Sequence, residues 1–202
     1  MSAIHEKIGA VVSCGLAQAL KSAGYRKKGF NFGQDVSTTV VRLVNVQASQ
    51  WNTAREGEFT INLGVYHRDL AELHDILPPV KSPKVYDCVI QQRIGLIMPE
   101  RLDHWWSITR STNIAALGAE VAEVWYEYGK PWLELHCSLK QAREFLITHN
   151  HFFLAAMASL ALGQKREARQ WVTRASVEWP GGADRIRAWR DHQLRSDTAH
   201  RK

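Results

Sequence analysis

The sequence predicts an α+β fold, in which an antiparallel sheet of about four to five strands packs with helices and an all-helical C-terminal segment follows. The stretch EFTINLGVYHRD (58–69) alternates apolar and other residues with a period of two, which is typical of a strand. From residue 138 onward, by contrast, the apolar residues recur at helical spacing. We therefore expect an α+β domain over 1–130, a helical C-terminal extension docked on it over 131–195, and a frayed tail over 196–202.

The N-terminal part is expected to hold one long helix and two paired strands. Apolar residues at helical spacing predict a helix over 3–23, and Gly24 provides its C-terminal stop. A turn is expected at FGQD (32–35). The segment 37–49 is rich in β-branched residues and predicts a strand. This strand should pair with the one over 58–69 as its antiparallel neighbour.

The middle of the chain is expected to contain shorter elements. A helix is predicted over 68–77, where two prolines end it, and strands are predicted over 86–95 and 103–109. Either Thr112 or Asn113 could cap the helix that follows.

That helix should run to Tyr128, with Gly129 and Pro131 ending it. Beyond this point Ser138 is expected to cap a further helix over 139–150.

Three more helices are expected over 151–163, 164–179 and 182–195, of which the first two resemble a helical hairpin. No second copy of this hairpin occurs, so a repeat array is not predicted.

Composition excludes several classes of protein. The chain of 202 residues is 45% hydrophobic and 23% charged, which is typical of a folded globular protein. The longest apolar runs are too short to span a bilayer, and the first 20 residues lack the pattern of a signal peptide, so a cytoplasmic location without membrane contact is expected. Its three cysteines lie far apart without CxxC spacing, which predicts reduced thiols.

The candidate site is a polar face of the predicted sheet. Asn45 and Gln47 lie two apart and therefore share a face of one strand. On the next strand Asn62 and Tyr66 share a face with Thr60, opposite the apolar residues. Amides offer both donors and acceptors, so this face could bind a polar ligand or a peptide edge.

Two further residues complete the predicted binding set. Arg93, at the end of the third strand, offers a planar fork of donors for carboxylate or phosphate. Trp105 and Trp106 are adjacent on a strand and point to opposite faces, so one of them should be exposed, and we select Trp105. The alternative interpretation is that the amides satisfy irregular backbone at strand ends or face water. If the face is functional, Asn62→Ala and Arg93→Ala should leave thermal stability near wild type and weaken binding of the partner. A large drop in melting temperature with unchanged binding would instead make Asn62 a structural amide.

The sequence contains little that indicates a metal site, a catalytic residue or a nucleotide-binding site. His136, His149 and His151 lie near one another in the chain but lack the spacing of a metal site. No catalytic elbow, cysteine-protease signature, P-loop or dinucleotide fingerprint occurs. No cofactor, metal site or catalytic residue is therefore predicted.

The net charge of +6 is concentrated near the C-terminus, where ten Lys or Arg stand against five Asp or Glu from Gly163 onward. Arg185, Arg187 and Arg190 flank Trp189 there, and basic plus aromatic residues suit nucleic acid.

Five short sequence segments, taken in this order, resemble those of a known family. GYRKKGFNF, VNVQASQWN, FTINLGVY, YDCVIQQRIG and WW resemble the bacterial family called domain of unknown function 4304, over about residues 3–128. The resemblance implies a small cytosolic bacterial α+β domain with no accepted active site. It does not extend to the helical stretch from 138 onward.

The sequence is compatible with three classes of function. The leading one is a non-catalytic cytosolic protein-binding module, and within it an immunity protein or antitoxin that neutralises a bacterial toxin. The second is an enzyme with an unfamiliar site on the polar sheet face. The third is a nucleic-acid binder acting through the basic C-terminal helices, which the nearly neutral charge of the first 162 residues disfavours.

Overall fold

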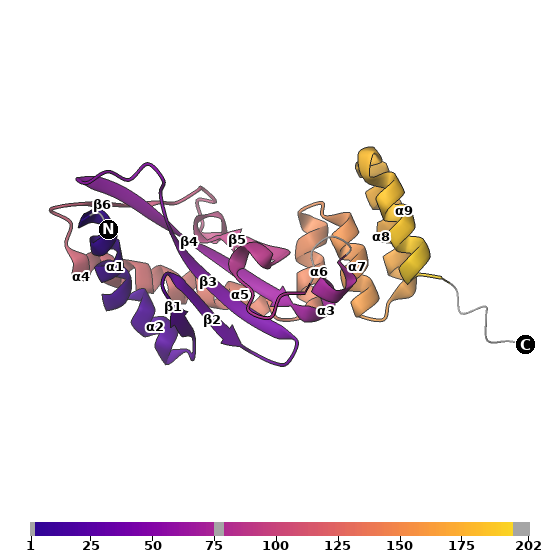
Figure 1. Cartoon of the computed structure of the whole chain (residues 1–202), viewed down its shortest axis with the longest axis horizontal. Helices are drawn as coiled ribbons and strands as arrows, with labels where there is room; N and C mark the ends of the chain where they lie inside the picture. The colour runs from indigo at the N-terminus through magenta and orange to yellow at the C-terminus, as the bar shows by residue number, and fades with distance from the viewer. Residues whose placement is uncertain (1–2, 75–78, 196–202) are drawn as a thin grey trace, which may run out of the picture. The chain divides into compact units, whose positions relative to one another are not determined.

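The computed structural model describes residues 3–74 and 79–195 (Figure 1). Its contacts divide the chain into two compact units. The sheet unit comprises Met1–Tyr66 and Lys81–Cys137, and the helical unit comprises His67–Val80 and Ser138–Lys202. The tail expected over 196–202 lies outside the described residues. No helix of the described chain is long and apolar enough to cross a membrane.

The sheet unit contains a six-stranded sheet, which confirms the predicted α+β fold. The order is β1-β2-β3-β4-β5, and β6 also pairs with β4. The strand β4 is long enough to pair antiparallel with β6 along its first half and with β5 along its second half. The strands are β1 (Arg26–Lys28), β2 (Asn31–Asp35), β3 (Val40–Ala48), β4 (Glu56–His67), β5 (Ile90–Arg93) and β6 (Trp106–Thr109).

The hairpin β1–β2 corrects one prediction. FGQD was expected to be a turn, but Phe32–Asp35 belong to β2. The chain turns earlier, between Lys28 and Asn31, which are paired opposite each other. Gly29 occupies the first position of this two-residue turn with a φ of 61°, the left-handed backbone that glycine adopts without strain.

Helices cover one face of the sheet. α1 (Ala3–Cys14) and α2 (Leu16–Ser22) pack against α4 (Ile114–Val124). The expected single helix over 3–23 is interrupted at Gly15, where α1 ends at Cys14 and α2 begins at Leu16. A Cβ at Gly15 would lie 1.8 Å from the backbone oxygen of Gly118. Only glycine allows the two backbones to approach so closely.

The core of the sheet unit lies beneath these helices. The alternating residues of β4 that were predicted to face the core are fully buried: Phe59, Ile61, Leu63 and Val65. Trp106 stacks on Phe59 at 5.5 Å between ring centroids, and its Nε1 donates a hydrogen bond to Glu120 of α4.

The helix after Asn113 continues past its predicted end. Of the two candidate caps, Asn113 is the one that caps α4, accepting hydrogen bonds from the backbone N–H groups of Ala115 and Ala116. Gly129 and Pro131 do not stop it. A π-helical turn, Trp125–Gly129, leads into α5 (Lys130–His136), with Pro131 in the first turn of α5. Proline lacks an N–H and crowds the carbonyl four residues earlier, and the wider π turn relieves this conflict.

The second face of the sheet is covered only in part. A Cβ on Gly64 would lie 2.9 Å from Cys88 Sγ, so the segment around the 3-10 turn Val85–Asp87 covers the sheet there. This turn also explains why β5 is shorter than the strand expected over 86–95. Thr60 is buried, and its Oγ1 donates to the carbonyl of His104 at 2.8 Å. The open part of the face lies between these two connections.

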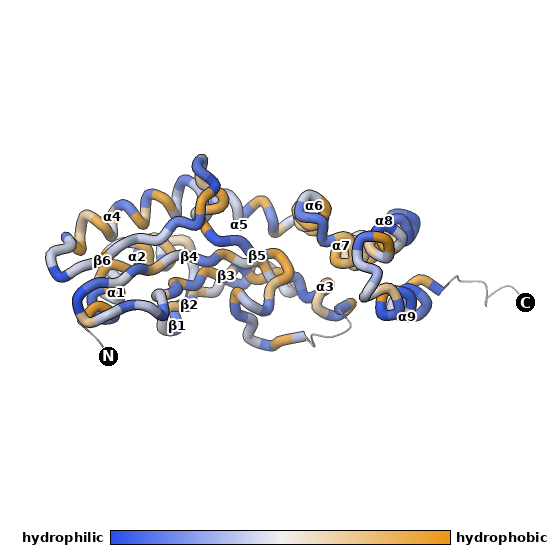
Figure 2. The backbone as a smooth tube through the Cα atoms, turned by 90° about the horizontal axis from the view of Figure 1, so that it is seen from above, coloured by the Kyte–Doolittle hydropathy of each residue, from blue (hydrophilic) through white to orange (hydrophobic). Residues whose placement is uncertain are grey.

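The helical unit is built from short antiparallel helices. In sequence order they are α3 (Arg68–Leu73), α6 (Leu139–Thr148), α7 (Phe152–Ala161), α8 (Lys165–Glu178) and α9 (Ala183–Gln193). α7 is the most apolar, as its largely orange tube in Figure 2 shows, and it packs against α3, α6 and α8. Trp189 of α9 donates from Nε1 to the carbonyl of Leu73 at 2.8 Å. α3 ends at Leu73, and residues 75–77 of the helix predicted over 68–77 lie outside the described ones.

Candidate functional site

Five polar side chains share the open face of the sheet. Strand register places Asn31 of β2 opposite Asn45 of β3, and Asn62 of β4 opposite Arg93 of β5. Directly opposed residues in antiparallel strands point to the same face. Gln47, two residues after Asn45, shares that face. We call these five residues the amide row.

Hydrogen bonds connect the amide row from strand to strand. The Nδ2 of Asn45 donates to Oδ1 of Asn31 at 3.0 Å. Asn62 donates from Nδ2 to Asn45 Oδ1 at 3.2 Å and to Gln47 Oε1 at 2.9 Å. The Nε of Arg93 in turn donates to Asn62 Oδ1 at 3.4 Å. Asn62 is therefore the central member, because it contacts three of the other four.

Arg93 is held from two further directions. Its Nη1 donates to Asp103 Oδ2 at 2.5 Å, and its Cζ lies 5.1 Å from the centroid of the Trp105 ring. The hydrogen bond from Arg93, aided by one from Trp105, lowers the pKa of the Asp103 carboxyl below its usual value. The guanidinium is thus fixed between an ionised carboxylate and an aromatic face, with its side chain 29% exposed.

The chemistry of the amide row favours recognition over proton transfer. Amide side chains neither gain nor lose a proton near neutral pH, and a guanidinium stays charged. Asp103, which contacts the row through Arg93, is kept ionised. What the surface offers is a set of oriented donors and acceptors, which match the N–H and C=O groups of another polypeptide.

Large apolar side chains project from the two connections that flank the amide row. Tyr86, in the 3-10 turn that covers the face near Gly64, is 72% exposed. Leu102, directly before Asp103, is 67% exposed. Trp105 itself is half-buried against Arg93. Aromatic side chains such as Tyr and Trp are enriched at protein interfaces relative to the rest of a protein surface.

The structure brings together five of the six residues that the sequence indicated. Asn45, Gln47, Asn62, Arg93 and Trp105 form one connected surface.

The sixth residue, Tyr66, is not part of the open surface, because the residue is only 3% exposed. The face that carries Thr60 and Tyr66 is therefore buried at both of these positions rather than solvated.

Sequence reasoning missed Asn31 and Asp103. Asn31 was assigned to the region before a turn, although its alternation with Phe30 and Phe32 is a strand signal.

The other candidate groups serve local roles. His136 Nδ1 lies 2.7 Å from the carbonyl of Trp132, and His149 Nδ1 lies 2.8 Å from that of Phe145, one helical turn earlier in each case. Within residues 3–74 and 79–195, no three His, Cys, Asp or Glu side chains are grouped so as to hold a metal ion. Burial raises the pKa of the Cys88 thiol, which disfavours a reactive thiolate.

The basic residues near the C-terminus are engaged with neighbours. Arg187 pairs with Asp184, and Arg190 pairs with Asp191 at 2.8 Å. Trp189 is 4% exposed, so its ring is not presented for stacking with a base.

Comparison with known proteins places the sheet unit in a family. The model of the family described as Domain of unknown function (DUF4304) matches residues 16–135, more than half of the chain. The chain belongs to this family. The DUF4304 match includes all six strands and therefore every member of the amide row. The helices from α6 onward lie beyond it. No curated protein and no solved structure matches the chain.

Proposed function

We propose that this DUF4304 protein is a non-catalytic protein-binding module and that the amide row, with Trp105, is its binding surface. One observation carries the proposal: a hydrogen-bonded row of amides and a fixed guanidinium crosses the uncovered part of a sheet face. Groups of this kind recognise a partner's polar atoms but supply no proton donor or base at neutral pH.

The arrangement also supports specificity. The mutual hydrogen bonds and the Asp103 pair hold the side chains in place before a partner arrives, so less conformational entropy is lost on binding. Arg and Trp are the residue types that most often dominate binding energy at interfaces. Loss of a hydrogen bond from Arg93 to a charged group of the partner should cost about 1.5–3 kcal/mol.

Within this class, we propose that the partner is a toxin that the protein neutralises in the bacterial cytoplasm. A sheet face that presents donors, acceptors and a cation suits capping of a polar, functional surface on another protein. The test is co-expression. A gene adjacent to this one, expressed alone, should arrest growth, and co-expression with the wild-type chain should restore it.

The binding proposal is tested with single substitutions on the same face. The wild-type chain serves as bait for capture and mass spectrometry, and the captured partner is then purified and titrated by calorimetry. Arg93→Ala and Trp105→Ala should weaken binding by about tenfold or more, since 1.4 kcal/mol is a factor of ten in Kd.

Gln91→Ala is the matched control, because Gln91 is an exposed amide that faces the same side on β5, opposite Gly64. Equal affinity of the Arg93→Ala and Gln91→Ala proteins would contradict the proposal. Turnover of a small substrate that depends on Arg93, or nucleic-acid binding that falls steeply with salt, would favour the enzyme or nucleic-acid alternatives instead.

A further inference from the structure

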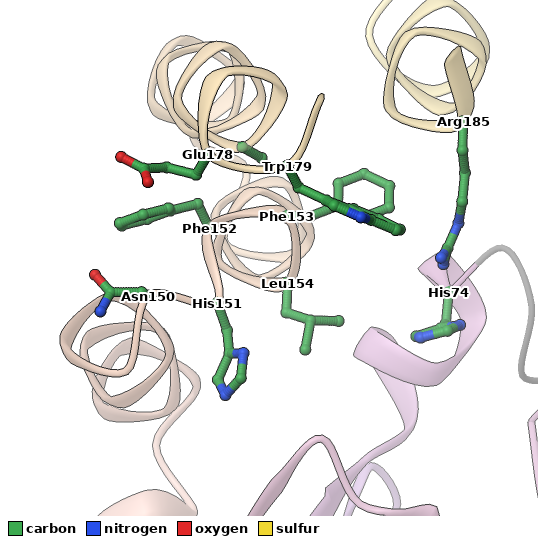
Figure 3. A pocket seen from close by; sticks show the side chains of 10 residues that line it. His74, Asn150, His151, Phe152, Phe153, Leu154, Glu178, Trp179 and Arg185 are labelled. Atoms are coloured by element: carbon green, nitrogen blue, oxygen red, sulfur yellow. The ribbon is translucent and has the colours of Figure 1, made fainter. Parts of the chain in front are cut away.

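The helical unit contains a pocket that the proposed function does not use. It lies between the start of α7, the end of α8, the start of α9 and the end of α3 (Figure 3). Its volume is about 340 Å³, at the small end of the range for ligand-binding pockets, roughly 300–1,000 Å³. The family match ends at residue 135, so most of this pocket is built from residues outside it.

Apolar and aromatic side chains provide most of the surface on which a ligand would rest. Phe153 and Leu154 come from the first turn of α7, and Trp179 follows α8. In Figure 3 the Leu154 side chain points into the space between His151 and His74. Trp179 is 47% exposed, so its ring remains accessible to a ligand.

The guanidinium group of Arg185 lies at one side of this apolar surface. The Cζ of Arg185 lies 5.4 Å from the centroid of the Phe153 ring and 5.7 Å from that of the Trp179 ring. Stacking against aromatic rings fixes the plane of a guanidinium, while its N–H groups point outward in that plane. A guanidinium has five N–H donors, so it can serve a ligand in addition to an existing acceptor.

The start of α7 adds a second favourable element for an anion. The first N–H groups of a helix lack partners within the helix and carry the positive end of its dipole. Here they belong to pocket-lining residues, and the His151 side chain forms no capping hydrogen bond with the described part of the chain. Glu178, the acidic residue of the lining, is on the opposite side from Arg185 and is paired with Arg174 at 2.6 Å.

We propose that this pocket binds an apolar or aromatic carboxylate, with the carboxylate on Arg185 and the apolar group against Leu154 and Trp179. Arg185 matches a carboxylate because both are planar and can form two parallel hydrogen bonds. The carboxylate can come from a free acid or from the C-terminal residue of a polypeptide, and the two sources share this chemistry.

The test compares acids with their uncharged amides on the full chain. Binding of 3-phenylpropionate and 3-phenylpropionamide is measured by calorimetry and by ligand-observed NMR. We expect a Kd on the order of 1 mM for the acid and at least tenfold weaker binding of the amide. A pentapeptide ending in Phe, with a free or an amidated C-terminus, forms the second pair. The peptide acid binding more tightly than the free acid would identify a polypeptide C-terminus as the source, and the reverse order would identify a free acid.

Variants locate the binding within the pocket. Arg185→Gln should reduce binding of the acid to the level of the amide. Arg187→Gln is the matched control, because Arg187 lies on the same helix and pairs with Asp184. Leu154→Trp should block acid and amide alike by filling the pocket, and it provides a second variant that keeps Arg185 in place.

Three results would overturn the proposal. The first is absence of measurable binding of either acid at about 10 mM. The second is equal binding of acid and amide. The third is unchanged binding in Arg185→Gln or in Leu154→Trp, with a melting temperature that shows the variant to be folded.

Discussion

Replacing Asn62 by alanine tests whether the amide row exists as a connected structure in solution. The substitution removes two donated hydrogen bonds, at 3.2 Å to Asn45 and 2.9 Å to Gln47, and one accepted from Arg93 at 3.4 Å. A neutral hydrogen bond contributes about 0.5–1.5 kcal/mol net, and the 3.4 Å contact is long enough to count for little. Asn62 is only half-buried, so the partners left behind can bind water instead. We therefore expect a loss of about 1–2 kcal/mol in the free energy of unfolding.

The assay must report on the sheet unit by itself, because the chain has two compact units. Hydrogen exchange of the backbone amides of β3 and β4 does so, read alongside urea denaturation. Gln91→Ala is the control and should change stability by less than about 0.5 kcal/mol. It removes an exposed amide from the same face, and Gln91 forms no side-chain hydrogen bond with the described residues.

A result for Asn62→Ala that equals the Gln91→Ala result would refute the reasoning. It would mean that Asn62 meets only water and that the row is not organised before binding. A loss well above 3 kcal/mol would contradict it in the other direction, because it would make Asn62 a buried structural group.

Three further predictions concern stability and charge in the sheet unit. Gly15→Ala should lower the free energy of unfolding by about 1–3 kcal/mol, since the added Cβ would meet the backbone of α4. Gly9→Ala, with nothing within 4 Å of its new Cβ, should instead stabilise α1 by up to about 1 kcal/mol; equal effects in urea denaturation would contradict the packing. Asn113→Ala should cost about 1 kcal/mol in the same assay through loss of the cap on α4, and an unchanged midpoint would count against that cap. The carboxyl of Asp103 should titrate by NMR below the unperturbed pKa of about 3.9. The ion pair between Asp103 and Arg93 should therefore persist at neutral pH and be lost only as the pH falls through that lowered pKa. Arg93→Gln should raise the pKa of Asp103. If Arg93→Gln leaves the titration of Asp103 unchanged, Arg93 is not the cause of the lowered pKa.

The local sequence determined the secondary structure where one periodicity was strong. The alternation along β4 identified its core face, and Asn113 identified the start of α4. The buried face of β4 and the start of α4 both depend on residues close by in the chain, so a local sequence pattern is enough to predict them. The same alternation also placed Asn45 and Gln47 on one face, because side chains two apart in a strand point the same way.

Tertiary structure decided what covers each face and where elements are interrupted. Thr60 and Tyr66 were expected on an open face, yet both are buried, and Thr60 bonds to the carbonyl of His104, 44 residues away. Position 15, where the expected helix is interrupted, accepts only glycine because the backbone of α4 approaches it at Gly118. Such contacts join positions far apart in the chain, so no local pattern announces them.

In the candidate site, too, the sequence predicted part of the arrangement and the tertiary structure decided the rest. The chain itself indicated that Asn62 and Arg93 were polar residues on predicted strands, without indicating how those strands align. Strand register then placed Arg93 opposite Asn62, and placed Asn31 opposite Asn45. A shift of one residue in either pairing would turn one member of each pair to the other face. Because register is set by the packing of the whole sheet, only the folded structure could show that these side chains form one connected row.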